Sequence, residues 1–168
     1  MIVKRKKVTK IPGAGEWAGY KDDFSAREAH AFWFGKSLDD AQPYFEGGQS
    51  IQRAQELLYM PRVAFRFYVF AFAEYVMSEA AVGDSDAASS FLNNLTAREK
   101  RDPGSVAQIF ARLEPTIDFV AGSQARFDAS HDNYGDFTEI AQELKKLVGA
   151  THSPRDPEDQ MLDSTDDA

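Results

Sequence analysis

The sequence predicts an all-α protein, an irregular bundle of six or seven helices around a central hydrophobic helix over about residues 61–82. Two observations lead to this prediction. Helix caps and stops recur at short intervals along the chain, and one stretch between them is far more apolar than the rest. No internal repeat with a period of 20–50 residues is present, so a solenoid is not supported. A chain of 168 residues is long enough to form one domain.

The stretch from Pro61 to Val82 holds four Phe, two Tyr and five Ala, and it contains no Gly. On a helical wheel its apolar side chains leave no wide polar face, which predicts a helix buried on several sides. Arg66 and Glu74 interrupt the apolar run and argue against a membrane span. A strand is the competing interpretation, because aromatic residues alternate over 65–70. The length of the stretch, its alanines and the stop at Gly83 favour the helix.

The remaining helices are predicted from capping residues that precede apolar residues at helical spacing. A capping box begins at Ser25, Ser37 repeats the signal, and Ser50 precedes a third amphipathic segment. Asp84 or Ser85 caps the helix after the central one, and Asp136 begins the last. The predicted helices cover about residues 25–34, 38–45, 51–59, 85–101, 105–127 with a break or kink at Glu114-Pro115, and 136–148 with a stop at Gly149.

Three regions are predicted along the chain: an irregular basic segment over 1–23, a single helical domain over 24–149, and a disordered acidic tail over 150–168. The basic run at residues 4–7 is not followed by a hydrophobic segment, so a signal peptide is not expected. A cytoplasmic location is therefore the expectation. The absence of cysteine excludes disulfides, thiol catalysis and Cys-based zinc sites.

The net charge of −8 bears on the class of partner. Phosphate binding needs a basic surface, so nucleic acid is not expected as a partner, and neither is a membrane. An acidic body would accelerate the encounter with a basic protein, although it also serves solubility.

No catalytic residue and no cofactor are predicted, because the chain has neither a Cys nor a Gly-x-Ser-x-Gly elbow. Residues 128–139 resemble an EF-hand calcium loop, but Asn133 replaces the usual glycine and Gly135 occupies a position that normally pairs with a second loop. The alternative interpretation is a polar connection between helices, and a metal is not expected there. The candidate ligands are Asp128, Ser130, Asp132, Asp136 and Glu139.

Arg66 and Glu74 are candidates for buried ionic groups on the central helix. Burying a charge is costly unless it is paired, so both are expected to be paired or to lie at the edge of the core. A desolvated Glu74 would have a raised pKa and would be the best isolated acid for catalysis.

Aromatic side chains are dense near the first helix, and those of residues 32–34 cannot all face one core. At least one of them therefore covers another element or is exposed, and an exposed aromatic residue beside acids is expected to contact another protein. Core packing against the helix over 61–82 is the expectation for most of the others. The predicted contact residues are Trp17, Tyr20, Trp33, Asp39 and Asp40.

The function predicted from the sequence is non-enzymatic binding of a basic protein, as immunity proteins and antitoxins bind their targets. The alternative is a helical protein that binds a small ligand or a metal, possibly an enzyme, with a pocket near the central helix or at the 128–139 loop. A helical homodimer with a self-buried aromatic surface is a third hypothesis.

Overall fold

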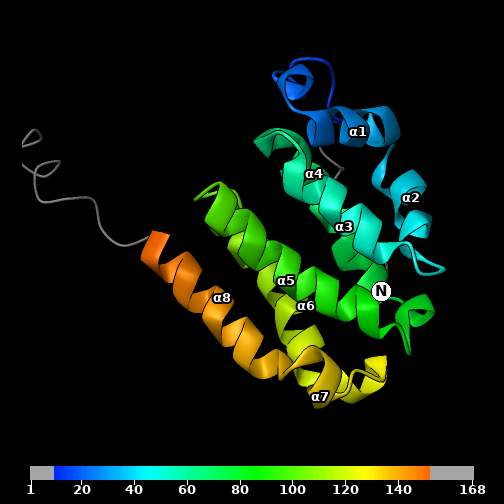
Figure 1. Ribbon diagram of the computed structural model, residues 1–168, viewed down its shortest axis with the longest axis vertical. Coiled ribbons are helices and arrows are strands. Elements are labelled where there is room, and N and C mark those ends of the chain that lie inside the picture. Colours follow the sequence, from blue (N-terminus) through cyan, green and yellow to red (C-terminus); the bar gives the residue numbers. More distant parts are fainter. Residues whose placement is uncertain (1–9, 152–168) are drawn as a thin grey trace, which may run out of the picture.

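A computed structural model of the chain describes residues 10–151, which form helices joined by short turns and contain no strand (Figure 1). This confirms the all-α prediction. The predicted basic segment is described only from Lys10 onward, and the predicted tail only as far as Thr151. Six α-helices of ten or more residues make up most of this part: α1 (Phe24–Trp33), α3 (Ser50–Tyr59), α4 (Arg62–Met77), α5 (Ser85–Arg101), α6 (Phe110–Gly122) and α8 (Phe137–Thr151).

The shorter elements connect these helices. Two are single α-helical turns, α2 (Leu38–Ala41) and α7 (His131–Tyr134). The others are 3-10 helices: η1 (Tyr20–Asp22), η2 (Gln42–Phe45), η3 (Glu79–Ala81), η4 (Ala107–Ile109) and η5 (Gln124–Phe127). One continuous hydrophobic core extends from Trp17 to Val148 and draws on every long helix.

The central helix of the prediction is α4, and ten of its sixteen residues are buried. It contacts α2, η2, α3, α5 and α6, so neighbours surround it on several sides as the apolar wheel predicts. The Tyr68 hydroxyl, buried within this core, donates to the backbone carbonyls of Trp33 (2.7 Å) and Lys36 (2.8 Å). Burial raises the pKa of Tyr68 to about 12.

The end of α4 differs from the prediction, because the helix stops at Met77 and not near Val82. Ser78 adopts an extended conformation, and its hydroxyl donates to the Tyr75 carbonyl at 2.6 Å. A serine hydroxyl can compete in this way with the backbone bonds of a helix. The chain then forms η3 before it reaches Gly83.

Several predicted helix ends are confirmed and others are wrong. Ser37 forms a complete capping box, and Asp84 caps α5 by accepting from the Ala87 amide. Asp23 caps α1 in place of Ser25, because the chain enters the helix two residues earlier and Asp23 accepts from the Ala26 amide at 2.9 Å. Ser50 lies inside the first turn of α3 and makes no capping hydrogen bond.

Two residues expected to break helices are accommodated within them. Helix α6 continues through Pro115, whose missing N–H removes the helical hydrogen bond to the carbonyl of Ala111, an exposed residue. Helix α8 continues through Gly149, where an exposed glycine costs only about 1 kcal/mol relative to alanine.

The connection between α5 and α6 is organised by a buried carboxylate. Glu99 is 1% exposed, and its two oxygens accept the backbone N–H groups of Gly104 (2.7 Å), Val106 (2.7 Å) and Ala107 (3.1 Å). These three amides precede or begin η4, so one side chain fixes the path of the chain into α6. The neighbouring Arg98 donates through Nε to the Ser105 hydroxyl of the same connection at 3.3 Å and reaches with Nη1 to the end of α3.

Arg98 is almost completely buried and donates hydrogen bonds at the carboxyl end of α3. Its Nη1 donates to the carbonyls of Leu58 (2.8 Å) and Met60 (2.6 Å), and its Nη2 lies 3.3 Å from the carboxylate of Asp102. A cation at this position satisfies the unpaired carbonyls at a helix end and the negative end of the helix dipole. Burial lowers the pKa of Arg98 to about 10.

Candidate functional site

The described surface has one end with a high density of acids. Residues 37–52 and 67–97 together carry seven Asp and Glu and no Lys or Arg. The fold joins these segments because α2, η2 and η3 all contact α4. We call this surface the acidic end and define it by its exposed acids, which are Asp39, Asp40, Glu46, Glu74, Glu79 and Asp86.

The connection from η5 to α8 extends the acidic end. The Tyr134 hydroxyl donates to Asp86 Oδ1 at 2.9 Å and accepts from the Ser85 hydroxyl at 2.9 Å. The Gly83 amide donates to the Arg126 carbonyl at 2.9 Å. These contacts bring the acids of residues 128–139 beside those of η3 and α5, and Arg126 lies 3.6 Å from Glu79.

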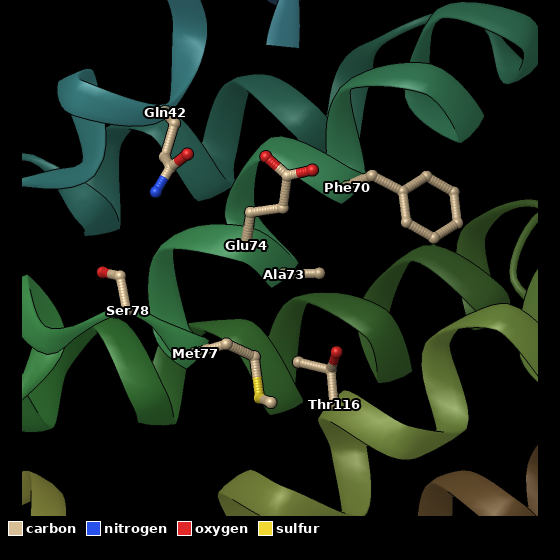
Figure 2. Close-up of a pocket in the computed structure, with 7 residues that line it drawn as sticks. All are labelled: Gln42, Phe70, Ala73, Glu74, Met77, Ser78 and Thr116. Atoms are coloured by element: carbon tan, nitrogen blue, oxygen red, sulfur yellow. The ribbon is translucent and has the colours of Figure 1, made fainter. Parts of the chain in front are cut away.

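A recess of about 380 Å³ lies beside the acidic end (Figure 2). Glu74 points between Gln42 of η2 and Phe70, while Met77 extends toward Thr116 of α6. Glu74, a candidate for a buried acid, is exposed at this recess and so lies at the edge of the core, one of the two positions expected for it. The lining combines one acid with apolar surface, and its residues are Gln42, Phe70, Ala73, Glu74, Met77, Ser78 and Thr116.

Arg66 lies two turns before Glu74 on the same open side of α4, and it is half-buried. Its Nη2 donates to the Gly104 carbonyl (3.1 Å) and to the Gln108 side chain, and its Nε donates to the Ser105 carbonyl (3.4 Å). Burial, and secondarily the positive charge of Arg62, lowers the pKa of Arg66. The connection that Glu99 organises thus holds the Arg66 guanidinium in place.

The predicted contact residues are divided between core and surface. Trp17 and Trp33 are 0% exposed, so the expectation of exposed indoles at these positions is wrong. Both rings contact Tyr68 of α4, at centroid distances of 6.3 Å for Trp17 and 5.1 Å for Trp33. Asp39 and Asp40 are exposed on α2, and hydrogen bonds from Ser37 lower the pKa of Asp40.

Tyr20, the remaining predicted contact residue, is half-buried against α1. Its ring stacks on the His30 imidazole at a centroid distance of 3.7 Å, and the Phe34 ring lies 4.7 Å from the same imidazole. Trp17 meets His30 edge-on at 5.2 Å. Burial, and secondarily the charge of Lys21, lowers the pKa of His30. This aromatic cluster fastens residues 10–22 to α1.

The segment that resembles a calcium loop does not wrap around a common centre. Helix α7 occupies its middle, and the Ser130 hydroxyl caps that helix by accepting from the Asn133 amide. Gln124 fixes the connection by donating to the Ala129 and Gly135 carbonyls and accepting from the Phe137 amide. Within residues 10–151, no group of three His, Cys, Asp or Glu side chains is placed to hold a metal ion.

The carboxylate of Glu56 was not among the residues predicted from the sequence. Glu56 of α3 is partly buried, accepts from the Trp33 indole N–H at 2.7 Å and lies 3.1 Å from the Arg53 guanidinium. Burial raises its pKa, and the hydrogen bond from Trp33 opposes the shift. A small polar recess of about 170 Å³ lies beside it, lined by Ser25, Glu28, Gln52, Gln55, Glu56 and Tyr59. The i, i+3 spacing of Arg53 and Glu56 is the one signal in the sequence.

Comparison of the chain with models of protein families, with characterised proteins and with solved structures finds no match. Among the described helices, none combines the length and the apolar character that crossing a bilayer requires.

Proposed function

We propose that this is a non-enzymatic cytoplasmic protein that binds a basic protein through its acidic end, in the manner of immunity proteins and antitoxins. The observation that carries the proposal is the absence of Lys and Arg from the two segments that form this end. Arg126 lies beside Glu79, and Lys36 acts on Asp40, so seven acids against these two cations leave the surface with a net negative charge. A net negative surface steers an oppositely charged partner toward it.

The position of Glu74 and Glu79 at the carboxyl end of α4 supports a role in binding. The last turn of α4 carries Glu74 and no basic residue, and Glu79 follows in η3. A negative charge at a helix carboxyl end opposes the helix dipole, so these acids do not stabilise the helix they end. Helix α5 shows the usual arrangement, since its last turn carries Arg98, Lys100 and Arg101.

Apolar side chains lie among the acids and offer contact area. Tyr44 of η2, Met77 of α4 and Val82 after η3 are each at least 40% exposed. Binding energy at protein interfaces concentrates in such side chains once they are desolvated, while surrounding charges set specificity and the rate of encounter.

The experiment is affinity capture from the native lysate at low and high salt. A variant with Glu46→Lys and Glu79→Lys reverses two exposed charges of the acidic end. The control variant, Glu114→Lys and Glu143→Lys, makes the same change of net charge on exposed positions of α6 and α8. We expect the wild type and the control to recover one basic partner in stoichiometric amount, more weakly at high salt, and the acidic-end variant to lose it. Recovery of no stoichiometric partner under either condition, or equal recovery by both variants, would contradict the proposal.

A further inference from the structure

Helix α4 is buried on most sides but leaves one stripe open. Its members are Val63, Arg66, Phe70, Glu74 and Met77, which follow the spacing of one helix face. Val63 is 52% and Met77 is 44% exposed, Glu74 is exposed, and Arg66 and Phe70 are half-buried. A partner that covers this exposed stripe would remove apolar surface from water, which favours association.

The stripe is symmetric about Phe70. Val63 and Met77 are apolar and each lies seven residues from it, while Arg66 and Glu74 carry opposite charges and each lies four residues from it. A surface that is to contact its own copy across a two-fold axis must be self-complementary in this sense. An antiparallel copy of α4 centred on Phe70 would place Arg66 opposite the partner's Glu74 and Val63 opposite the partner's Met77.

We propose that a second copy of this chain docks antiparallel on the open stripe of α4, with the two-fold axis at Phe70. The recess in Figure 2 supplies the hole for this contact. Phe70, Ala73, Glu74 and Met77 line it at positions i, i+3, i+4 and i+7, the four residues of a helix that receive one knob from a facing helix. The knob is the partner's Arg66, whose aliphatic stem covers apolar surface while its guanidinium meets Glu74.

Arg66 is held in a suitable position for this contact. Its hydrogen bonds to Gly104, Ser105 and Gln108 use Nε and Nη2, which account for three of the five N–H donors of a guanidinium. Nη1 takes no part in these three hydrogen bonds, and its two N–H groups are the ones that would meet a carboxylate. Since the side chain is already ordered by the α5–α6 connection, less conformational entropy is lost on pairing.

The charges also select the direction of the contact. The first half of α4 carries Arg62 and Arg66, and the second half carries Glu74. The Arg112 guanidinium of α6 lies 4.1 Å from the Phe70 ring centroid, at the centre of the stripe, where it would face its own copy in either direction. A parallel pair would bring like charges together, whereas an antiparallel pair brings opposite charges together. The stripe runs over fifteen residues, from Val63 to Met77, and rises about 21 Å along the helix, which places the contact among the weak interfaces of under about 1,200 Å². The inference shares Glu74 and Met77 with the acidic end, but it does not rest on a basic partner, because its tests use purified protein alone.

The chain has no cysteine, which permits a direct test by crosslinking. A Phe70→Cys variant places a thiol at the axis, where it faces its own copy, and oxidation should produce a disulfide-linked dimer. The control Glu143→Cys places an exposed thiol on α8 and should produce little. Equal crosslinking at both positions, or none at residue 70, would overturn the proposal.

Sedimentation equilibrium from roughly 10 µM to 1 mM, the range expected of weak interfaces, tests the charges. Arg66→Glu and Glu74→Arg should each weaken the dimer at least ~10-fold, because each sets like charges opposite one another. An equimolar mixture of these two variants restores both ion pairs in the heterodimer and should associate as the wild type does. Val63→Glu alters an exposed side chain and should weaken the dimer without affecting the fold. A wild type that is monomeric throughout, or a mixture no stronger than either variant alone, would refute the inference.

Discussion

Replacement of Glu99 by alanine tests how far one buried carboxylate organises the connection between α5 and α6. The substitution removes the acceptor of three buried backbone N–H groups, at 2.7, 2.7 and 3.1 Å. A hydrogen bond to a charged acceptor contributes about 1.5 kcal/mol at the low end, so three amount to about 4.5 kcal/mol. That loss is a large fraction of the free energy of unfolding of an ordinary domain, about 5–15 kcal/mol.

Urea denaturation followed by far-ultraviolet circular dichroism measures this loss. With a denaturant slope of about 2 kcal/mol per molar, the midpoint should fall by about 2 M. Glu99→Gln keeps one acceptor oxygen but turns an amide toward one of the N–H groups, and should lose about half as much free energy. The control Glu143→Ala changes an exposed residue and should stay within about 0.5 kcal/mol of the wild type. A loss below about 1.5 kcal/mol for Glu99→Ala would refute the reasoning, since water would then satisfy the three amides.

Two further predictions concern stability. The pKa of His30 is lowered in the folded protein, so the unfolded chain binds a proton first as the pH falls. Stability from this residue is therefore complete above the ordinary histidine value of about 6.5 and is lost as the pH falls below it. Urea titrations at about pH 7.5 and pH 5 should show this loss in the wild type, and His30→Gln should reduce it; an unchanged pH dependence in the variant would contradict the assignment. Asp84→Ala removes the cap of α5 and the acceptor of the Tyr75 hydroxyl at 2.7 Å. It should lower the free energy of unfolding by about 1–2 kcal/mol in the same assay, against less than about 0.5 kcal/mol for Asp39→Ala.

Local signals were sufficient where a short stretch of chain decides the structure. The capping box at Ser37 and the cap at Asp84 depend only on residues within one turn, and both formed as predicted. The prediction that α4 is a helix buried on several sides likewise depends only on the residues of that helix. Ser25 failed as a cap because Asp23, two residues earlier, is an equally good acceptor and the sequence does not rank the two.

Burial could not be predicted where distant segments decide it. Trp17 lies in a glycine-rich stretch without helical periodicity, and only the folding of that stretch over α1 places its indole in the core. Glu74 is a candidate for a buried acid because its neighbours in sequence are apolar, but its side chain lines a recess at the edge of the core. Glu99 lies in a run of charged residues that predicts a solvated helix end, and its three amide partners come from a turn that the sequence leaves undetermined.

For the candidate site, the sequence predicts a negative net charge and two exposed acids, whose contact with a partner stays a prediction. These acids are Asp39 and Asp40, and both are exposed on the acidic end. Residues 37–52 lie beside residues 67–97 because α2 and η2 contact α4. These are tertiary contacts, which the sequence alone does not predict. The symmetry of the open stripe about Phe70 is present in the sequence, but it becomes meaningful only once the exposed side of α4 is known.

The burial of both tryptophans has a consequence for spectroscopy. The chain contains two tryptophans, Trp17 and Trp33, and both lie in the layer formed by the first helix and the amino-terminal half of α4. Intrinsic emission therefore reports on this layer, whereas circular dichroism reports on all helices together. If α5, α6 and α8 lose their packing before this layer does, the dichroism changes while the emission wavelength does not. Coincidence of the two unfolding curves would establish that the bundle melts as one cooperative unit.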